Sequence, residues 1–301
     1  MSEIQKIKII EFTDPVCSWC WALEPILRKL ETRYKDHLEL TFVMGGLVRD
    51  ISDFYSSSIS SERNPEHTND VINSHWKEAS AKHHMPVVAK GFHLFSKEYP
   101  SAYPLNIAYK AAQMENQQLA DKFLRRLREA SIVEAKLTNR QEVLIELASE
   151  VGLDVSQFIL HLKDGSAEKA FKEDLATTQR YGVHGFPTSL IQYGNKEVLL
   201  RGYQSYESFK AVIDSLSGGK IIEAISPVSK ENILQFIKTY KRVAPEEIRM
   251  AFDIQVSEVS AYMKTLVQEK IVRSILAGNG EFIELIGNPV VCDPETGVCQ
   301  I

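Results

Sequence analysis

Two cysteines near the N-terminus have the spacing of a reactive dithiol. Cys17 and Cys20 are separated by Ser18 and Trp19, in a 301-residue chain that has four cysteines. A thiolate is favoured where a cysteine begins a helix, because unpaired backbone N–H groups and the helix dipole stabilise negative charge. Such a pair exchanges disulfides through a mixed-disulfide intermediate. We therefore predict that Cys17 is the attacking thiolate and Cys20 the resolving cysteine.

The alternative for this pair is half of a zinc site, which needs four ligands. No second Cys-x-x-Cys occurs, and no pair of histidines has matching spacing. Redox chemistry is therefore favoured over metal binding. The sequence predicts neither a metal nor any other cofactor.

The surrounding segments are those that position a dithiol. The apolar, β-branched run Ile7 to Phe12 predicts a buried strand, and Thr13-Asp14-Pro15 predicts a turn. After Cys20 the apolar residues recur with helical spacing. Strand, turn, Cys-x-x-Cys and helix is the context in which such a pair is redox-active.

Glu11 lies inside the apolar strand, where a carboxylate is costly unless it has a partner or a function. We assign Glu11 as the proton acceptor for Cys20. The alternative is an acid at the strand edge that faces water. Glu24, one helical turn after Cys20, is the second candidate base and is expected to face solvent.

The rest of the first two-thirds of the chain predicts a thioredoxin-like α/β fold with a large helical insertion. A second strand is predicted at Leu38 to Met44, followed by Gly45-Gly46, and later strands at 188–192 and 197–200 precede a helix at 205–216. The insertion, about residues 66–182, is predicted to be helical at 66–84, 87–99, 105–117, 118–135, 140–151, 155–164 and 166–181. Arg125 and Arg126 are expected on a solvated helix face.

Three motifs resemble those of one superfamily: Asp14-Pro15-x-Cys-x-Trp-Cys-Trp, Gly45-Gly46, and Val183-His184-Gly185-Phe186-Pro187-Thr188. On these motifs residues 1–217 resemble the DsbA-like thioredoxin superfamily, and more narrowly its FrnE-like, predicted disulfide-isomerase branch. The resemblance implies that Pro187 is cis and faces the cysteine pair. It also implies that the backbone of Phe186 pairs with an extended substrate. Glu11 stands at the position where the superfamily carries a buried acid. Trp19 is expected to form an apolar surface for substrate. His184, three residues before Pro187, is a weaker candidate for a catalytic residue near the cysteines.

The last part of the chain predicts a second domain. A linker at 218–227 precedes helices predicted at 230–243, 245–252 and 256–270 and strands at 271–275 and 281–286. Residues 228–288 resemble a winged helix-turn-helix. Residues 228–287 contain eight Lys/Arg and eight Asp/Glu. DNA affinity needs clustered positive charge, so protein docking is favoured and DNA binding is the alternative.

The tail, residues 289–301, carries Cys292 and Cys299 in a segment with turn residues. We interpret them as a redox-active pair that exchanges with the Cys17–Cys20 pair. The alternative is an inert or partner-bound pair of thiols.

Composition bounds the function. Net charge is −5, from 35 Lys+Arg against 40 Asp+Glu, which provides no general attraction to nucleic acid or an anionic membrane. The N-terminus has no secretory signal, so a cytoplasmic location is expected. We predict a cytoplasmic protein thiol–disulfide oxidoreductase or isomerase. It would act on protein thiols and disulfides, with thioredoxin or a low-molecular-weight thiol as electron donor. The alternative is a non-enzymatic redox-sensing adaptor or regulator acting through the winged-helix-like domain.

Overall fold

A four-stranded sheet forms the centre of the first part of the chain. The computed structural model describes residues 5–54, 64–286, 291–292 and 299–300. Strand β1 (Ile7–Thr13) leads into α1 (Ser18–Tyr34), a short 3₁₀ turn η1 (Lys35–His37) and β2 (Leu38–Met44). Strands β3 (Thr188–Tyr193) and β4 (Lys196–Arg201) follow the insertion, and α8 (Tyr206–Ser217) closes the unit.

The strand order is β2-β1-β3-β4, with β2 parallel to β1 and the other two pairs antiparallel. The apolar run in β1 buries Ile7, Ile9 and Phe12 completely. This β-α-β, insertion, β-β-α order is the thioredoxin-like arrangement that the sequence predicted.

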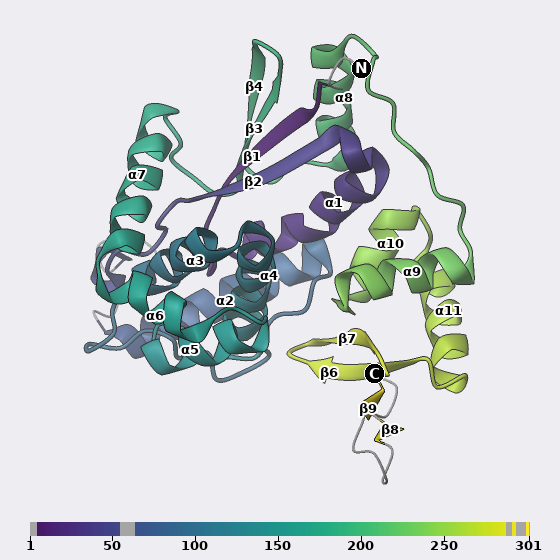
Figure 1. Ribbon diagram of the computed structural model, residues 1–301. Helices are drawn as coiled ribbons and strands as arrows, with labels where there is room; N and C mark the ends of the chain where they lie inside the picture. The colour runs from purple at the N-terminus through teal and green to yellow at the C-terminus, as the bar shows by residue number, and fades with distance from the viewer. Residues whose placement is uncertain (1–4, 55–63, 287–290, 293–298, 301) are drawn as a thin grey trace.

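Between β2 and β3 the chain is mainly helical. The helices gather below the sheet in the view of Figure 1. In order they are η2 (Ile51–Phe54), α2 (Pro65–His83), α3 (Tyr103–Glu115), α4 (Gln117–Arg128), the π-helical turn η3 (Glu129–Val133), α5 (Gln141–Glu150), α6 (Val155–Lys163) and α7 (Ser166–Arg180). Asp154 caps α6 by accepting the N–H groups of Ser156 and Gln157.

The helix predicted at 87–99 is wrong, because residues 84–102 contain no helix. Proline cannot supply a helical N–H, and Pro86 and Pro100 bracket this segment. Its apolar residues, among them Phe92 and Phe95, are nevertheless buried. The Asn69 side chain donates to the Phe95 carbonyl at 2.8 Å and accepts the Phe95 N–H. Polar side chains of other elements therefore satisfy this backbone in place of helical hydrogen bonds.

The C-terminal unit has three helices and a small antiparallel sheet. Its elements are α9 (Lys230–Tyr240), β5 (Arg242–Val243), α10 (Pro245–Phe252), α11 (Val256–Gln268), β6 (Val272–Ala277) and β7 (Gly280–Leu285). The first helix ends three residues earlier than predicted, because Arg242 and Val243 pair with β7 in a sheet of order β5-β7-β6. The order of elements agrees with a winged helix, and that assignment stays a prediction.

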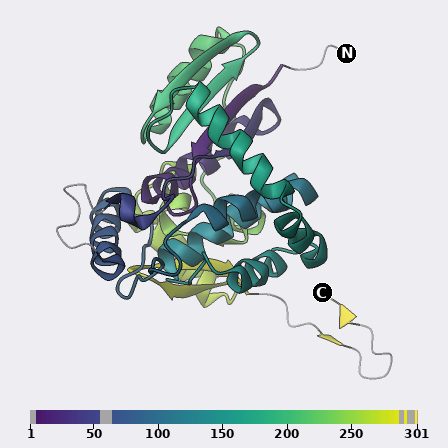
Figure 2. The same cartoon turned by 90° about the vertical axis from the view of Figure 1, so that its left-hand side faces the viewer.

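The two units are packed together, and they share part of one hydrophobic core. Helix α10 packs along α1, and Phe282 of β7 lies against Trp21 with 6.3 Å between the ring centroids. The linker residues 218–227 are tied back where the Ala224 N–H donates to the Arg33 carbonyl at 2.7 Å. In Figure 2 the sheet lies at the top of the molecule and the yellow β6–β7 hairpin at the bottom.

The β6–β7 turn reaches the segment after α2. The Asn279 N–H donates to the Val87 carbonyl at 2.8 Å, and Asn279 Oδ1 accepts the Val87 N–H at 2.8 Å. Gly278 has φ +58°, and a Cβ there would lie 2.1 Å from the Val87 carbonyl oxygen. Only glycine therefore fits this contact.

In the tail, β8 (Val291–Cys292) pairs with β9 (Cys299–Gln300), and the register places Cys292 opposite Cys299. The remaining tail residues, and residues 55–63 of the loop after β2, lie outside the described residues. Within the ranges given above, no helix is long and apolar enough to cross a membrane.

Candidate functional site

Cys17 is the N-cap residue of α1, as its place in the sequence predicted. Its Sγ accepts the Cys20 N–H at 3.2 Å, and its thiol donates to the Phe186 carbonyl at 3.6 Å. Both cysteines are free thiols; Cys17 is 5% exposed and Cys20 is 1% exposed. Cys17 is thus the outer and Cys20 the inner member of the pair.

The Phe186–Pro187 peptide bond is cis, as the resemblance implied. The carbonyl of Phe186 lies beside Cys17, and its ring covers Gly45. A Cβ on Gly45 would lie 2.0 Å from that ring, so no larger residue fits there. The fold therefore brings the Phe186–Pro187 turn to Cys17 and Gly45, which precede it by more than 130 residues in the sequence.

An aromatic cluster borders the dithiol. The half-buried Trp19 ring lies 5.6 Å from the Tyr203 ring and 6.0 Å from the His83 ring, measured between centroids. Tyr203 is 38% exposed, whereas Trp21 is buried and donates to the Pro86 carbonyl at 2.8 Å. The sequence analysis missed Tyr203 and His83, for which it contains no local signal.

His83 is buried against Trp19, and its Nε2 has no hydrogen-bond partner in the part of the chain that the structure describes. Burial, assisted by His84, lowers the pKa of His83 to about 4. The ring is therefore neutral at pH 7 and places no positive charge beside the cysteines. His184, the weaker candidate from the sequence, is exposed.

Glu11 is buried, so the alternative of an edge acid in water is excluded. The Ser189 hydroxyl donates to its Oε2, and its Oε1 has no hydrogen-bond partner among the described residues. Burial, and then the negative charge of a Cys20 thiolate, raise the pKa of Glu11 well above its usual value. Burial and Cys17 raise the pKa of Cys20. Both groups therefore favour their neutral forms, and a negative charge on Cys20 disfavours a negative charge on Glu11.

Arg128, from α4 of the insertion, is the charged residue of this site that the sequence analysis missed. It is 1% exposed and donates to the Thr13 hydroxyl and to the Glu24 carboxylate. Its positive charge partly offsets the effect of burial on the pKa values of Cys20 and Glu11. The available signal was the repeated arginine in α4, at positions 125, 126 and 128.

The expected solvent exposure of Glu24 is wrong. Glu24 is 8% exposed, and although burial opposes its ionisation, Arg128, Arg125 and Arg28 lower its pKa to about 2. It is therefore ionised at pH 7 and is not a base for Cys20. The expected solvated face for Arg125 is also wrong, because that guanidinium pairs with Glu24 at 3.2 Å and with Glu129 at 2.7 Å.

These ion pairs continue into the C-terminal unit. Glu247 of α10 is completely buried and accepts two hydrogen bonds from Arg125, at 2.8 and 3.0 Å. Arg28 of α1 pairs with the same carboxylate at 2.8 Å. A connected set of ion pairs therefore runs from Arg128, whose charge acts on Cys20, through Glu24 and Arg125 to Glu247 of α10.

Within the described ranges, no group of three or more His, Cys, Asp or Glu side chains is arranged to hold a metal ion. The site thus consists of a buried dithiol, a buried acid, a cis-proline turn and an aromatic rim.

These features define a thioredoxin-type dithiol site. The thioredoxin family model matches residues 11–211, so the chain belongs to the thioredoxin family. The chain is 27% identical over 279 residues to the ClpXP adapter protein SpxH of Halalkalibacterium halodurans, covering 92% of this chain and 88% of the relative. It is 26% identical over 281 residues to the protein of the same name from Bacillus subtilis, again covering 92% and 88%.

Solved structures share the fold at lower sequence identity. A candidate protein disulfide isomerase from Nitrosomonas europaea has TM-score 0.60 and 19% identity, covering 72% of this chain and all of that chain. A candidate DsbA oxidoreductase from Streptomyces coelicolor has TM-score 0.54 and 16% identity, covering 74% of this chain and 93% of that chain. These similarities support a DsbA-like thioredoxin fold, and the FrnE-like branch stays a prediction.

The predicted function, a thiol–disulfide oxidoreductase or isomerase, is contradicted. The relatives that match 92% of the chain are named adapter proteins, not oxidoreductases. The dithiol motif misled because it identifies the fold, and one fold supports both catalytic and binding proteins.

Proposed function

We propose that this protein is an adapter that binds a client protein and presents it to ClpXP. The observation that carries the proposal is the extent of the similarity. The SpxH adapters match 92% of the chain, whereas the two solved redox-type structures match 72% and 74%. A match of 92% must extend beyond the thioredoxin-like unit, which ends at Ser217, into the C-terminal unit.

The face around Cys17 suits the holding of a protein segment. Trp19 and Tyr203 present partly exposed aromatic surface, and Leu47 adds an exposed aliphatic side chain after β2. Aromatic residues of this kind dominate the energetics of protein interfaces. We assign Trp19, and the turn formed by Phe186 and Pro187, to client binding.

The C-terminal unit suits the second contact of an adapter. A protein that bridges a client and a protease gains from a fixed geometry between its two binding faces. Here the buried Glu247 pairs and the Asn279 contacts with Val87 hold the unit against α1 and the insertion. The balanced charge of residues 228–287 favours docking to protein over DNA.

The dithiol gives the adapter a means to respond to oxidation. Formation of the Cys17–Cys20 disulfide would reduce a low-molecular-weight disulfide to two thiols, which take up the two electrons and the two protons that the dithiol loses. Glu11 would accept the proton of Cys20 in those molecules in which its carboxyl is ionised, and thioredoxin or a low-molecular-weight thiol would reduce the pair again. The adapter role implies a cytoplasmic location.

The test is the lifetime of individual proteins in cells. Some proteins should have longer half-lives when this chain is deleted. The half-lives of the same proteins should also increase when ClpX is deleted, and deletion of both should increase them no further. Complementation with a Cys17→Ser, Cys20→Ser variant should restore rapid degradation under reducing conditions, because an adapter binds without turnover of the dithiol. Trp19→Ala should restore it poorly. The proposal would be overturned if no protein had a half-life that depends on both this chain and ClpX. It would also be overturned if the serine variant did not restore degradation and the wild-type chain reduced insulin disulfides, because the dithiol would then act as a catalyst.

A further inference from the structure

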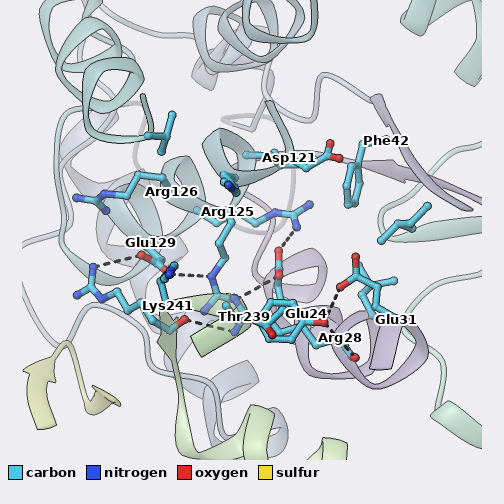
Figure 3. Close-up of a pocket in the computed structure, with 18 of the residues that line it drawn as sticks. Glu24, Arg28, Glu31, Phe42, Asp121, Arg125, Arg126, Glu129, Thr239 and Lys241 are labelled. Carbon is cyan, nitrogen blue, oxygen red and sulfur yellow. Dashed lines mark hydrogen bonds and ion pairs between the residues drawn. The ribbon is translucent and has the colours of Figure 1, made fainter. Parts of the chain in front are cut away.

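A cavity of about 720 Å³ lies where the two units meet, and neither cysteine lines it (Figure 3). Its apolar lining comes from the thioredoxin-like unit: Leu27 of α1, Leu40 and Phe42 of β2, and Leu124 of α4. Tyr240 and Arg242 of the C-terminal unit contribute to the same lining. A volume of this size at a boundary between units is typical of ligand sites.

Most charges that line the cavity are already paired. Glu24 and Glu129 pair with arginines of α4, Glu150 pairs with Arg126, and Glu284 pairs with Arg242. The lining has seven cationic and six acidic side chains, and each of its five arginines is paired with a carboxylate: Arg28, Arg125, Arg126, Arg128 and Arg242. Lys122 and Lys241 also line the cavity, but they are exposed, so water screens their charge.

Two carboxylates differ from the others. Glu31 accepts a hydrogen bond from the Tyr240 hydroxyl at 3.0 Å, and Asp121 accepts from the Tyr109 hydroxyl at 3.1 Å and from Gln117 at 2.8 Å. Among the residues that the structure describes, neither has a cationic group within ion-pair distance. The two carboxylates repel each other electrostatically, and both line the same cavity as Phe42 (Figure 3).

We propose that this cavity binds the side chain of an arginine or lysine from a protein partner. The alkyl stem would lie on Leu27, Leu40 and Phe42, and the charged end would lie between Glu31 and Asp121. That the occupant belongs to a protein rests on the proposed adapter function. The Arg128 guanidinium already lies 5.9 Å from the Phe42 ring centroid, so Phe42 contributes apolar contact to the bound stem.

The partly buried position of the two acids agrees with this assignment. Burial raises the pKa of Asp121 to about 6, and burial also raises the pKa of Glu31. A bound cation would stabilise their ionised forms. Because Tyr240 of α9 holds Glu31 of α1, the site is complete only while the C-terminal unit is docked.

The test uses fluorescein-labelled nine-residue peptides of alanine and glycine with arginine, lysine or glutamine at the centre. Fluorescence anisotropy with the full chain should show that the arginine and lysine peptides bind at least about tenfold more tightly than the glutamine peptide, since charged hydrogen bonds exceed neutral ones. Methyl NMR should show shifts at Leu27, Leu40 and Leu124, and none at Leu160, an exposed leucine of α6. Agmatine, which carries the guanidinium and an alkyl chain without a peptide backbone, is the comparison for a free small-molecule cation.

Asp121→Asn and Glu31→Gln should each weaken the arginine peptide about tenfold or more. Glu207→Gln, which changes an exposed acid in the first turn of α8, should leave its affinity unchanged. Equal affinity of the glutamine peptide, absence of binding, or binding of agmatine without binding of the peptides would overturn the proposal. Client lifetimes test the adapter function separately, so intact client degradation in a chain that binds no basic peptide would refute this site alone.

Discussion

Replacing Glu247 by glutamine should loosen the C-terminal unit from α1. The Glu247 carboxylate is completely buried and pairs with Arg28 at 2.8 Å and with Arg125 at 2.8 Å. Arg125 keeps Glu24 and Glu129 as partners, but Arg28 has no other ion pair among the described residues. The Glu247→Gln variant therefore leaves one buried guanidinium without its counter-ion.

Removal of one partner from a buried ion pair typically costs ~3–5 kcal/mol. We expect the lower end, ~3 kcal/mol, because the neutral amide oxygen of glutamine can still accept the Ala244 N–H that Glu247 accepts at 2.6 Å. A cost of this size is roughly a hundredfold in the equilibrium for opening.

Hydrogen–deuterium exchange with mass spectrometry measures that opening segment by segment. Peptides from α9, α10 and α11 should lose roughly a hundredfold of protection, while peptides from β1 and β3 change little. The matched control is Glu269→Gln, which removes the exposed Lys230–Glu269 pair in the same unit and should cost less than ~1 kcal/mol. The reasoning is refuted if both variants lose the same protection, or if the loss is as large in β1 as in α10.

Three further predictions concern the dithiol. Burial raises the pKa of Glu11 well above 4.5, so above pH 4.5 the folded chain keeps a proton that the unfolded chain has lost. Stability should therefore fall as pH rises through that range, by up to ~1.4 kcal/mol per pH unit, and urea unfolding of Glu11→Gln should show a smaller fall and higher stability at pH 7. Iodoacetamide at neutral pH should label Cys17 before Cys20, because Cys20 is more buried and has a raised pKa; equal labelling in the peptide maps would contradict this. Under mild oxidation Cys20→Ser should accumulate a disulfide between Cys17 and Cys292 or Cys299, and linkage of Cys17 to external thiols alone would show that the tail is no relay.

The parts of the fold that sequence could predict are those with local causes. The β-branched run of β1 and the apolar periodicity after Cys20 each reflect burial of one short element, and both are found where they were predicted. The second strand has the predicted bounds, Leu38–Met44, for the same reason. The cis bond before Pro187 came from the resemblance, not from any local pattern.

The parts that sequence could not predict depend on contacts between distant residues. Arg128 reaches Glu24 across 104 positions, and Arg125 reaches Glu247 across 122 positions. A charged residue on a helix reads as solvent-facing unless its distant partner is known, which is why Glu24 and Arg125 were misassigned. The prediction of a helix at 87–99 was wrong for the same reason, since Asn69 supplies hydrogen bonds that a helix would have supplied.

The linker at residues 218–227 marks a change in sequence pattern, but not a point where the protein can be divided. A chain cut there would uncover the face of Trp21 that Phe282 covers, and it would leave Arg28 without Glu247. It would also release the Val87 backbone from Asn279. A fragment of residues 1–217 would therefore expose an apolar surface that is buried in the full chain at the interface between the two units, and it would be prone to aggregate. In the evolution of such a chain, residues at this interface must change together, because a substitution in one unit alters its packing and ion pairs with the other.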